Sequence, residues 1–136
     1  MIKDIVKDQF FLQQKSIDAT KEDLPVVQDL LDTIQAHKTC VGIAANMIGE
    51  LKNIIVVYDG KQYLVLINPQ MIQAHKPLYT CQEGCLCHDG LKETKRYEKI
   101  KVKYLDQDFR PKIKTFDKQT AQIIQHEIDH CQGILI

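Results

Sequence analysis

The residues best suited to chemistry lie near the carboxyl end, in the string Gln125-His-Glu-Ile-Asp-His130. Residues four apart on a helix share one face, so the rings of His126 and His130 can bind one metal ion. Glu127 stands between them and can reach a water molecule on that metal. The pattern therefore predicts a metal centre with Glu127 as general acid and base. The plainer interpretation is a helix surface with two exposed histidines beside an acidic pair.

A third metal ligand is expected from a distant segment, because catalytic sites commonly use three protein ligands and keep one position for water. The segment Cys81-Gln-Glu-Gly-Cys-Leu-Cys87 supplies Cys85 as the natural choice. A thiolate binds such metals tightly, and Gly84 lets the backbone approach. A cysteine alone in such a segment is more often a small buried apolar residue. The paired histidines make the ligand the better interpretation.

The first half of the chain contains the elements of a core. Apolar residues at helical spacing predict a helix over about residues 24–36, with Asp23 as its cap and Pro25 in its first turn. Two runs of β-branched and aromatic residues flank Asp59-Gly60, which predicts a hairpin with a two-residue turn at positive φ. Asn68-Pro69 is expected to interrupt the second strand.

The second half begins with a polar stretch at 88–95 that is expected to be a loop. Residues 98–104 then alternate between apolar residues and lysines, and they predict a strand that pairs with residues 112–116. A helix is expected over about residues 118–132, with Gly133 in the left-handed position that ends it. The chain is therefore predicted to be α+β, with mainly antiparallel β-sheets packed around a C-terminal metal-binding helix.

Composition limits the classes of protein that remain. The 136 residues are 44% hydrophobic, which suits a single domain over residues 1–136. Eighteen basic residues balance eighteen acidic ones, so no global charge favours nucleic acid or an anionic membrane as a partner. The apolar runs are too short to span a bilayer. Five cysteines and no apolar export signal at the start predict reduced thiols and a cytoplasmic protein.

Three motifs, in order, resemble those of peptide deformylases, and the resemblance covers nearly the whole chain. That family carries Gly-h-Gly-h-Ala-Ala-x-Gln, Glu-Gly-Cys-h-Ser and Gln-His-Glu-x-Asp-His, where h is an apolar residue. The corresponding segments here are Cys40-Val-Gly-Ile-Ala-Ala-Asn-Met47, Glu83-Gly-Cys-Leu-Cys87 and Gln125-His-Glu-Ile-Asp-His130.

The resemblance implies a metallohydrolase that removes the formyl group from the initiator methionine of new peptides. By that analogy one divalent metal ion is held by Cys85, His126 and His130. Fe²⁺ is favoured, with Zn²⁺ or Ni²⁺ as the other choices. The substrate is then a nascent formylated peptide, which the resemblance places against Val41, Gly42 and Ile123.

The mechanism expected from the residues agrees with this resemblance. A bound metal lowers the pKa of its water from about 15.7 toward neutrality, and the resulting hydroxide attacks the formyl carbon. Glu127 takes the proton and later delivers it to the leaving amine. The backbone N–H of Leu86 stabilises the developing oxyanion, together with a glutamine side chain in the family.

Met47 stands at the position of that glutamine, and a thioether cannot donate a hydrogen bond. Losing such a donor typically costs about 10²- to 10³-fold in turnover. The neighbouring amide of Asn46 is expected to point to the opposite face of a strand. Three functions stay open. The first two are a deformylase or closely related amidase with reduced turnover, and a catalytically impaired deformylase-like metal-binding protein with a binding or regulatory role. A peptidase that uses the His-Glu-x-x-His helix is a third.

Three other positions depart from the family. Cys87 replaces a serine and, in an extended segment, would lie on the opposite face from Cys85, outside the metal site. A fourth thiolate there would close the coordination shell and make the site structural. Cys40 replaces a glycine and would crowd backbone that passes close to the site. Gln122 stands one turn before His126, where the family has an apolar wall, and would weaken methionine binding if it lines the pocket.

Overall fold

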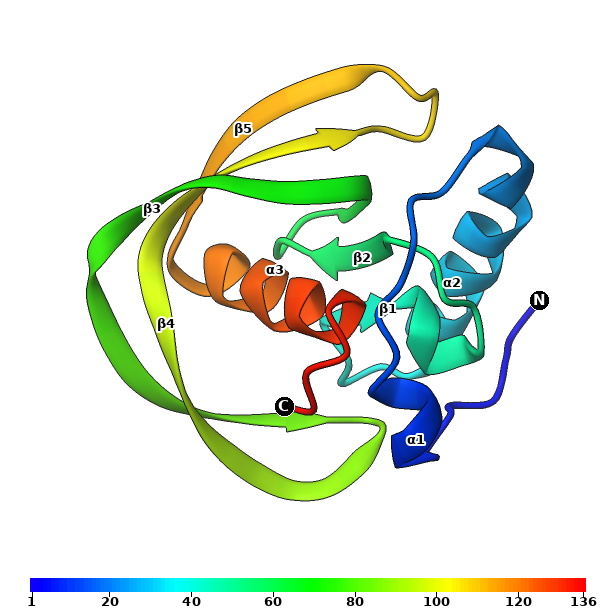
Figure 1. Cartoon of the computed structure of the whole chain (residues 1–136), viewed down its shortest axis with the longest axis horizontal. Coiled ribbons are helices and arrows are strands. Elements are labelled where there is room, and N and C mark those ends of the chain that lie inside the picture. The colour runs from blue at the N-terminus through cyan, green and yellow to red at the C-terminus, as the bar shows by residue number, and fades with distance from the viewer.

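Figure 1 shows the computed structural model, which describes residues 1–136 as a strongly curved sheet around one central helix. The sheet has the order β1-β2-β3-β4-β5, and every neighbouring pair of strands is antiparallel. The fold is α+β, as predicted. The strands are β1 (Gly42–Ala44), β2 (Ile54–Tyr58), β3 (Tyr63–Cys85), β4 (His88–Leu105) and β5 (Pro111–Asp117).

Three α-helices and two short 3₁₀ helices complete the chain. They are α1 (Gln9–Leu12), η1 (Lys21–Asp23), α2 (Leu24–Ala36), η2 (Ala45–Ile48) and α3 (Lys118–Cys131). The predicted helix over 24–36 is confirmed, with Pro25 in its first turn. Asp23 precedes it, but its carboxylate accepts a hydrogen bond from the N–H of Thr20 rather than from a helix amide. No helix has the length and apolar character needed to cross a membrane.

The central helix α3 is enclosed by the sheet, and β3 and β4 curve around it in Figure 1. Its apolar residues join one core with β2 and α2, in which Ile124, Leu30 and Ile34 are fully buried. The helix ends as predicted: Gly133 has a φ of +78°, and a Cβ there would lie 2.3 Å from the carbonyl oxygen of Gln13. Because this part of α3 is inside the molecule, four of its polar residues are buried as well: Gln125, His126, Glu127 and His130.

The long β3–β4 ribbon differs from the prediction in two places. The polar stretch 88–95 is the start of β4 rather than a loop. Asn68-Pro69 does not end β3, because Asn68 adopts a φ of +51° and the register shifts between Ile67 and Gln70. Such bulges bend a strand without ending it. Further shifts follow along the ribbon, and this irregular register allows it to curve around α3.

The predicted hairpin at Asp59 is confirmed, but the prediction of a two-residue turn is wrong. Tyr58 pairs with Tyr63, so the loop has four residues. The Asp59 carboxylate accepts hydrogen bonds of 2.8 Å from the N–H groups of Lys61 and Gln62, and only Gly60 has a positive φ. An aspartate that holds its own loop in this way replaces the tight turn.

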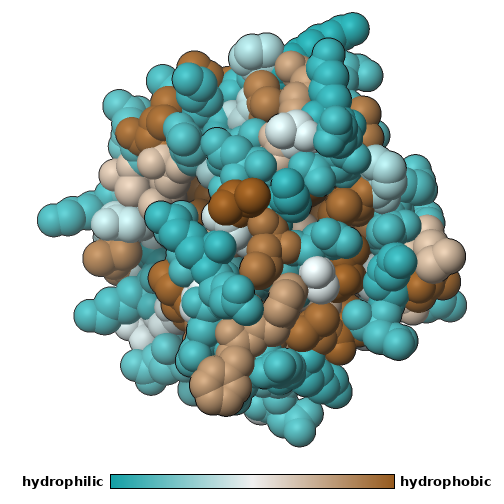
Figure 2. Space-filling model, turned by 45° about the vertical axis from the view of Figure 1, so that its right-hand side comes forward, coloured by the Kyte–Doolittle hydropathy of each residue, from teal (hydrophilic) through white to brown (hydrophobic).

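The second predicted hairpin is confirmed in full. Residues 98–104 lie in β4, and Lys103 pairs with Ile113 of β5. Ile100 and Val102 are fully buried, whereas the lysines between them point away from the core. On the face drawn in Figure 2, hydrophilic side chains predominate and the hydrophobic ones are scattered among them.

Candidate metal centre and substrate cavity

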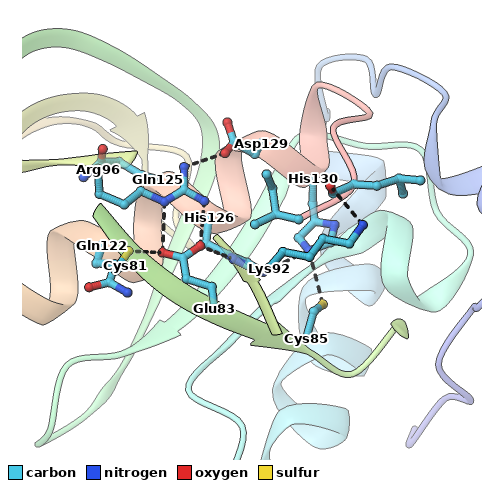
Figure 3. A network of polar contacts seen from close by, with 12 residues as sticks. Cys81, Glu83, Cys85, Lys92, Arg96, Gln122, Gln125, His126, Asp129 and His130 are labelled. Atoms are coloured by element: carbon cyan, nitrogen blue, oxygen red, sulfur yellow. Dashed lines mark hydrogen bonds and ion pairs between the residues drawn. The ribbon is translucent and has the colours of Figure 1, made fainter. Parts of the chain in front are cut away.

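Three potential ligands from two distant segments meet beside α3. Cys85 is the last residue of β3, and His126 and His130 lie one turn apart on α3. The Sγ of Cys85 lies 3.2 Å from Nε2 of His130, which lies 3.1 Å from Nε2 of His126. Ligands at about 2.0–2.3 Å from one metal lie about this far from each other. The structure therefore brings together the three residues that the sequence selected (Figure 3).

Cys87 lies beside this cluster, contrary to the expectation of an opposite face. Cys85 pairs with His88 across the end of the β3–β4 hairpin, so Leu86 and Cys87 form the turn. The expectation itself was wrong, because side chains two residues apart in an extended segment point to the same face, and the turn brings them closer still. The sulfur atoms of Cys85 and Cys87 lie 3.1 Å apart. Cys85, Cys87 and His130 thus form a second set of three donors, all within 4.8 Å of one another.

A buried ionic network holds the ring of His126. Its Nδ1 contacts Oε1 of Glu83 at 2.8 Å. The guanidinium of Arg96 donates to both oxygens of Glu83, at 2.7 and 3.0 Å, and to Asp129 at 2.6 Å. Glu83 and Arg96 are both buried. Burial alone would raise the pKa of Glu83, but the hydrogen bonds from His126 and Arg96 outweigh it and lower that pKa to about 2. A carboxylate on the outer nitrogen fixes the orientation of a histidine ligand.

Glu127 is buried next to the two histidines, and its Oε1 has no hydrogen-bond partner. Burial raises the pKa of this carboxyl to about 7, which suits a group that takes up and releases a proton near neutral pH. Gly42 gives it room: a Cβ at that position would lie 2.6 Å from both Oε2 of Glu127 and Cγ2 of Ile123. A glycine is therefore required where β1 passes α3.

A cavity of about 430 Å³ opens on this cluster. Its wall contains Cys85, His126 and Glu127, together with four residues that the sequence analysis assigned to substrate or oxyanion. Those four are Val41, Gly42, Leu86 and Ile123. The residues predicted to react and those predicted to contact substrate thus line one cavity, although they lie far apart in the sequence. A reacting group bound there can be attacked beside the metal donors and Glu127.

Comparison with known proteins places this arrangement in a family. The family model for polypeptide deformylase matches residues 2–136. The peptide deformylase of Clostridium beijerinckii is 52% identical, and the alignment covers the full length of both chains. The chain belongs to the peptide deformylase family. It is accordingly a hydrolase.

Solved structures of deformylases have the same fold. The enzyme from Thermotoga maritima superposes with a TM-score of 0.91 at 27% identity, covering 99% of this chain and 95% of the other. A deformylase from Acinetobacter baumannii with bound Met-Ala-Ser superposes with a TM-score of 0.91 at 25% identity, covering 99% and 97%. Fold and family therefore agree with the three motifs read from the sequence.

The donors of this deformylase fit a divalent metal ion. One thiol and two imidazoles are a set suited to Fe²⁺, Zn²⁺ or Ni²⁺. The unpartnered Oε1 of Glu127 is a second indication, because buried carboxylate oxygens in proteins normally have partners. The set formed by Cys85, Cys87 and His130 would also suit such an ion.

Met47 of this deformylase does not line the cavity. It is fully buried, and its Sδ accepts a hydrogen bond of 3.4 Å from the N–H of Ala44. The strand expected here ends at Ala44, and residues 45–48 form η2 instead. Asn46 is consequently not a surface strand residue: its Nδ2 donates to the carbonyl oxygen of His130 at 2.9 Å. Its amide is thus committed to α3 and does not replace the missing glutamine.

Gln122 does line the cavity of this deformylase. Its Oε1 accepts a hydrogen bond of 3.0 Å from the hydroxyl of Tyr79, which holds the side chain against β3. Cys40 also lines the cavity, with its Sγ donating to the carbonyl oxygen of Gly42 at 3.0 Å. Burial raises the pKa of Cys40 to about 11, so its thiol stays neutral. Both departures from the family therefore line the same cavity as His126 and Glu127.

Sequence reasoning missed the residues that support the ligands. Glu83 and Asp129 stood only as members of the quoted motifs, and Arg96 lies outside all three motifs. Gln125 was likewise known only as a member of a motif. Its side-chain amide donates to the carbonyl oxygen of Tyr97 and accepts from the N–H of Tyr97, both at 2.9 Å, and so links α3 to β4. Opposite charges at 83, 96 and 129 were the available signal, but nothing in the sequence placed them together.

Proposed function

We propose that this protein removes the N-formyl group from N-formylmethionyl peptides with the help of one divalent metal ion. The observation that carries the proposal is that Nε2 of His130 contacts both Cys85 and His126, and these two residues line one cavity together with Glu127. In this proposal Cys85, His126 and His130 hold the metal, with Fe²⁺ favoured. An ion held there would supply Lewis acidity, which makes a water molecule more acidic and a better nucleophile toward the formyl carbon.

The chain's own residues then handle the proton and the charge. Glu127 accepts the proton of the attacking water, because its buried carboxyl has a pKa near 7 and a free oxygen. It returns the proton to the amine as the C–N bond breaks. The N–H of Leu86, in the cavity wall, donates to the oxyanion. Glu83 keeps His126 oriented throughout, since it is itself held by Arg96.

The substrate in this proposal is a peptide with formylmethionine at its start. Val41, Gly42 and Ile123 contact the peptide along β1 and α3. Nascent chains carry this group, so the activity takes place in the cytoplasm where they are made. Turnover is lower than in relatives with the glutamine, because Met47 has no donor and its side chain turns back to Ala44.

The test is hydrolysis of a formyl-Met peptide by protein purified without oxygen, with metal content measured on the same sample. We expect release of formate by the wild type and loss of turnover in Glu127→Gln with the metal retained. An N-acetyl peptide and an unformylated peptide are the matched substrates. Cleavage of the unformylated peptide would indicate a peptidase.

The alternative, a metal-binding protein with a regulatory role, is favoured by one observation, the absence of a donor at Met47. It predicts a metal-loaded wild type that binds formyl peptides without hydrolysing them. Turnover that persists in Glu127→Gln would contradict the proposed proton transfer. Metal that is retained after removal of any one of the three ligands would contradict the proposed metal site.

A further inference from the structure

We propose that Cys85 and Cys87 form a reversible disulfide when a hydroperoxide oxidises Cys85. The two sulfur atoms lie 3.1 Å apart in the turn between β3 and β4. A disulfide bond is about 2.05 Å long, so the sulfurs need to approach by about 1 Å. Side-chain rotation in a two-residue turn can provide that movement while the strands stay paired.

The two cysteines differ in access, which assigns their roles. Cys85 is partly exposed and lines the cavity, so a small oxidant that enters the cavity reaches its sulfur. Cys87 is only 4% exposed and does not line the cavity. Cys85 is therefore the sulfur that meets the oxidant, and Cys87 is the sulfur that reacts next. A sensitive cysteine with a second thiol beside it is the arrangement that allows reversible oxidation.

The remaining cysteines do not serve this purpose. Cys40 directs its sulfur to the carbonyl oxygen of Gly42, and Cys81 directs its sulfur to Glu83. Cys131 is buried in the core of α3. The sulfur of Cys87 is the one that contacts the sulfur of Cys85.

The reaction balances with hydrogen peroxide as the oxidant. The sulfur of Cys85 attacks one peroxide oxygen and the O–O bond breaks. The other oxygen leaves as water with the thiol proton, or with a proton from solvent where Cys85 reacts as a metal-bound thiolate and releases the metal. The product is a sulfenic acid at Cys85. The sulfur of Cys87 then bonds to that of Cys85, the S–O bond breaks, and a second water leaves with the proton of Cys87. Two electrons pass from the two sulfurs to the peroxide.

The disulfide would remove a metal ligand and be easily reversed. A bridge that closes so short a loop is strained, and strained disulfides are readily reduced by thiols. Without Cys87, the sulfenic acid at Cys85 would continue to sulfinic acid, which thiols do not reverse. The consequence for metal binding rests on the proposed function, whereas the sulfur chemistry does not.

The experiment treats metal-loaded wild type, Cys87→Ser and Cys131→Ala with hydrogen peroxide. Free thiols are then alkylated, and the peptide that contains Cys81, Cys85 and Cys87 is analysed by mass spectrometry before and after dithiothreitol. The wild type and Cys131→Ala should show alkylation at Cys81 alone and a loss of two hydrogens between Cys85 and Cys87. Dithiothreitol should restore all the thiols.

Cys87→Ser should instead accumulate sulfinic acid at Cys85 that dithiothreitol does not reverse. Its melting curve, compared with that of the wild type, shows whether the variant is folded. The proposal is overturned if the wild type forms sulfinic acid as fast as Cys87→Ser, or if Cys85 bonds to another cysteine. These readouts do not use formyl peptides, so failure of the proposed hydrolysis would leave the result on the disulfide interpretable.

Discussion

Oε1 of Glu83 lies 2.8 Å from Nδ1 of His126, and this contact turns the other ring nitrogen toward His130. Glu83 comes from β3, two residues before Cys85, so the strand that carries one proposed metal ligand also orients another, His126. Arg96 on the neighbouring β4 fixes Glu83 with two hydrogen bonds. The geometry of the centre is therefore set by the sheet as much as by α3.

Glu83→Gln should lower metal affinity by about 10- to 100-fold, because a neutral amide orients and polarises the His126 ring less well. It should also destabilise the fold, since buried Arg96 loses its main counter-charge. Competition with a chelator measures the affinity, and thermal unfolding measures the stability. Glu93→Gln, on the exposed part of β4, is the matched control. Unchanged metal affinity in Glu83→Gln would show that the carboxylate does not support the ligand.

Gly42→Ala should reduce turnover while leaving metal content intact. The added methyl group would lie 2.6 Å from Oε2 of Glu127 and must displace that carboxylate. Gly60→Ala is a useful comparison, because its methyl group meets no atom within 4 Å and the residue does not line the cavity. Steady-state hydrolysis of a formyl peptide by the two variants tests the prediction. An equal loss in both would argue against a specific effect on Glu127.

Met47→Gln should raise turnover by about 10²- to 10³-fold if the new amide reaches the oxyanion. Met47→Leu keeps a similar volume without a donor and should show no increase. The gain should appear in kcat, since the donor acts on charge that develops in the transition state. A glutamine that instead follows the path of Met47 toward Ala44 would give no gain, and the reduced-turnover proposal would then fail.

We expect Asp106, in the turn between β4 and β5, to make the stability of the fold sensitive to acid. Its Oδ1 accepts hydrogen bonds from the N–H groups of Asp108 and Arg110, at 2.9 and 3.0 Å, and these bonds lower its pKa. A carboxyl with a lowered folded-state pKa adds stability above its unfolded pKa and loses it as pH falls through the folded value. Unfolding by urea at several pH values should therefore show less loss on acidification in Asp106→Asn. A variant that loses as much stability as the wild type would contradict this assignment.

The helices and strands with a regular apolar pattern could be predicted from the local sequence. The apolar spacing of residues 24–36 and the alternation of 98–104 describe α2 and part of β4 closely, because each pattern matches one buried face. The polar start of β4 was predicted to be a loop, because strand pairing rather than apolar burial stabilises it and leaves no apolar pattern in the sequence. The bend at Asn68-Pro69 was not predicted either, because a bulge depends on the register of the partner strand.

The sequence by itself determined the chemistry: two histidines one helical turn apart, a glutamate between them and a cysteine in a glycine-containing segment. These features depend on residue type and short spacing, which a helix converts directly into geometry. Only the tertiary structure decided which side chains meet across the sheet. The turn that joins β3 and β4 brings Cys87 to Cys85, η2 turns Met47 away from the cavity, and burial of α3 surrounds His126 with Glu83 and Arg96. Those contacts join residues far apart in the chain or depend on a turn, and neither is encoded by local periodicity.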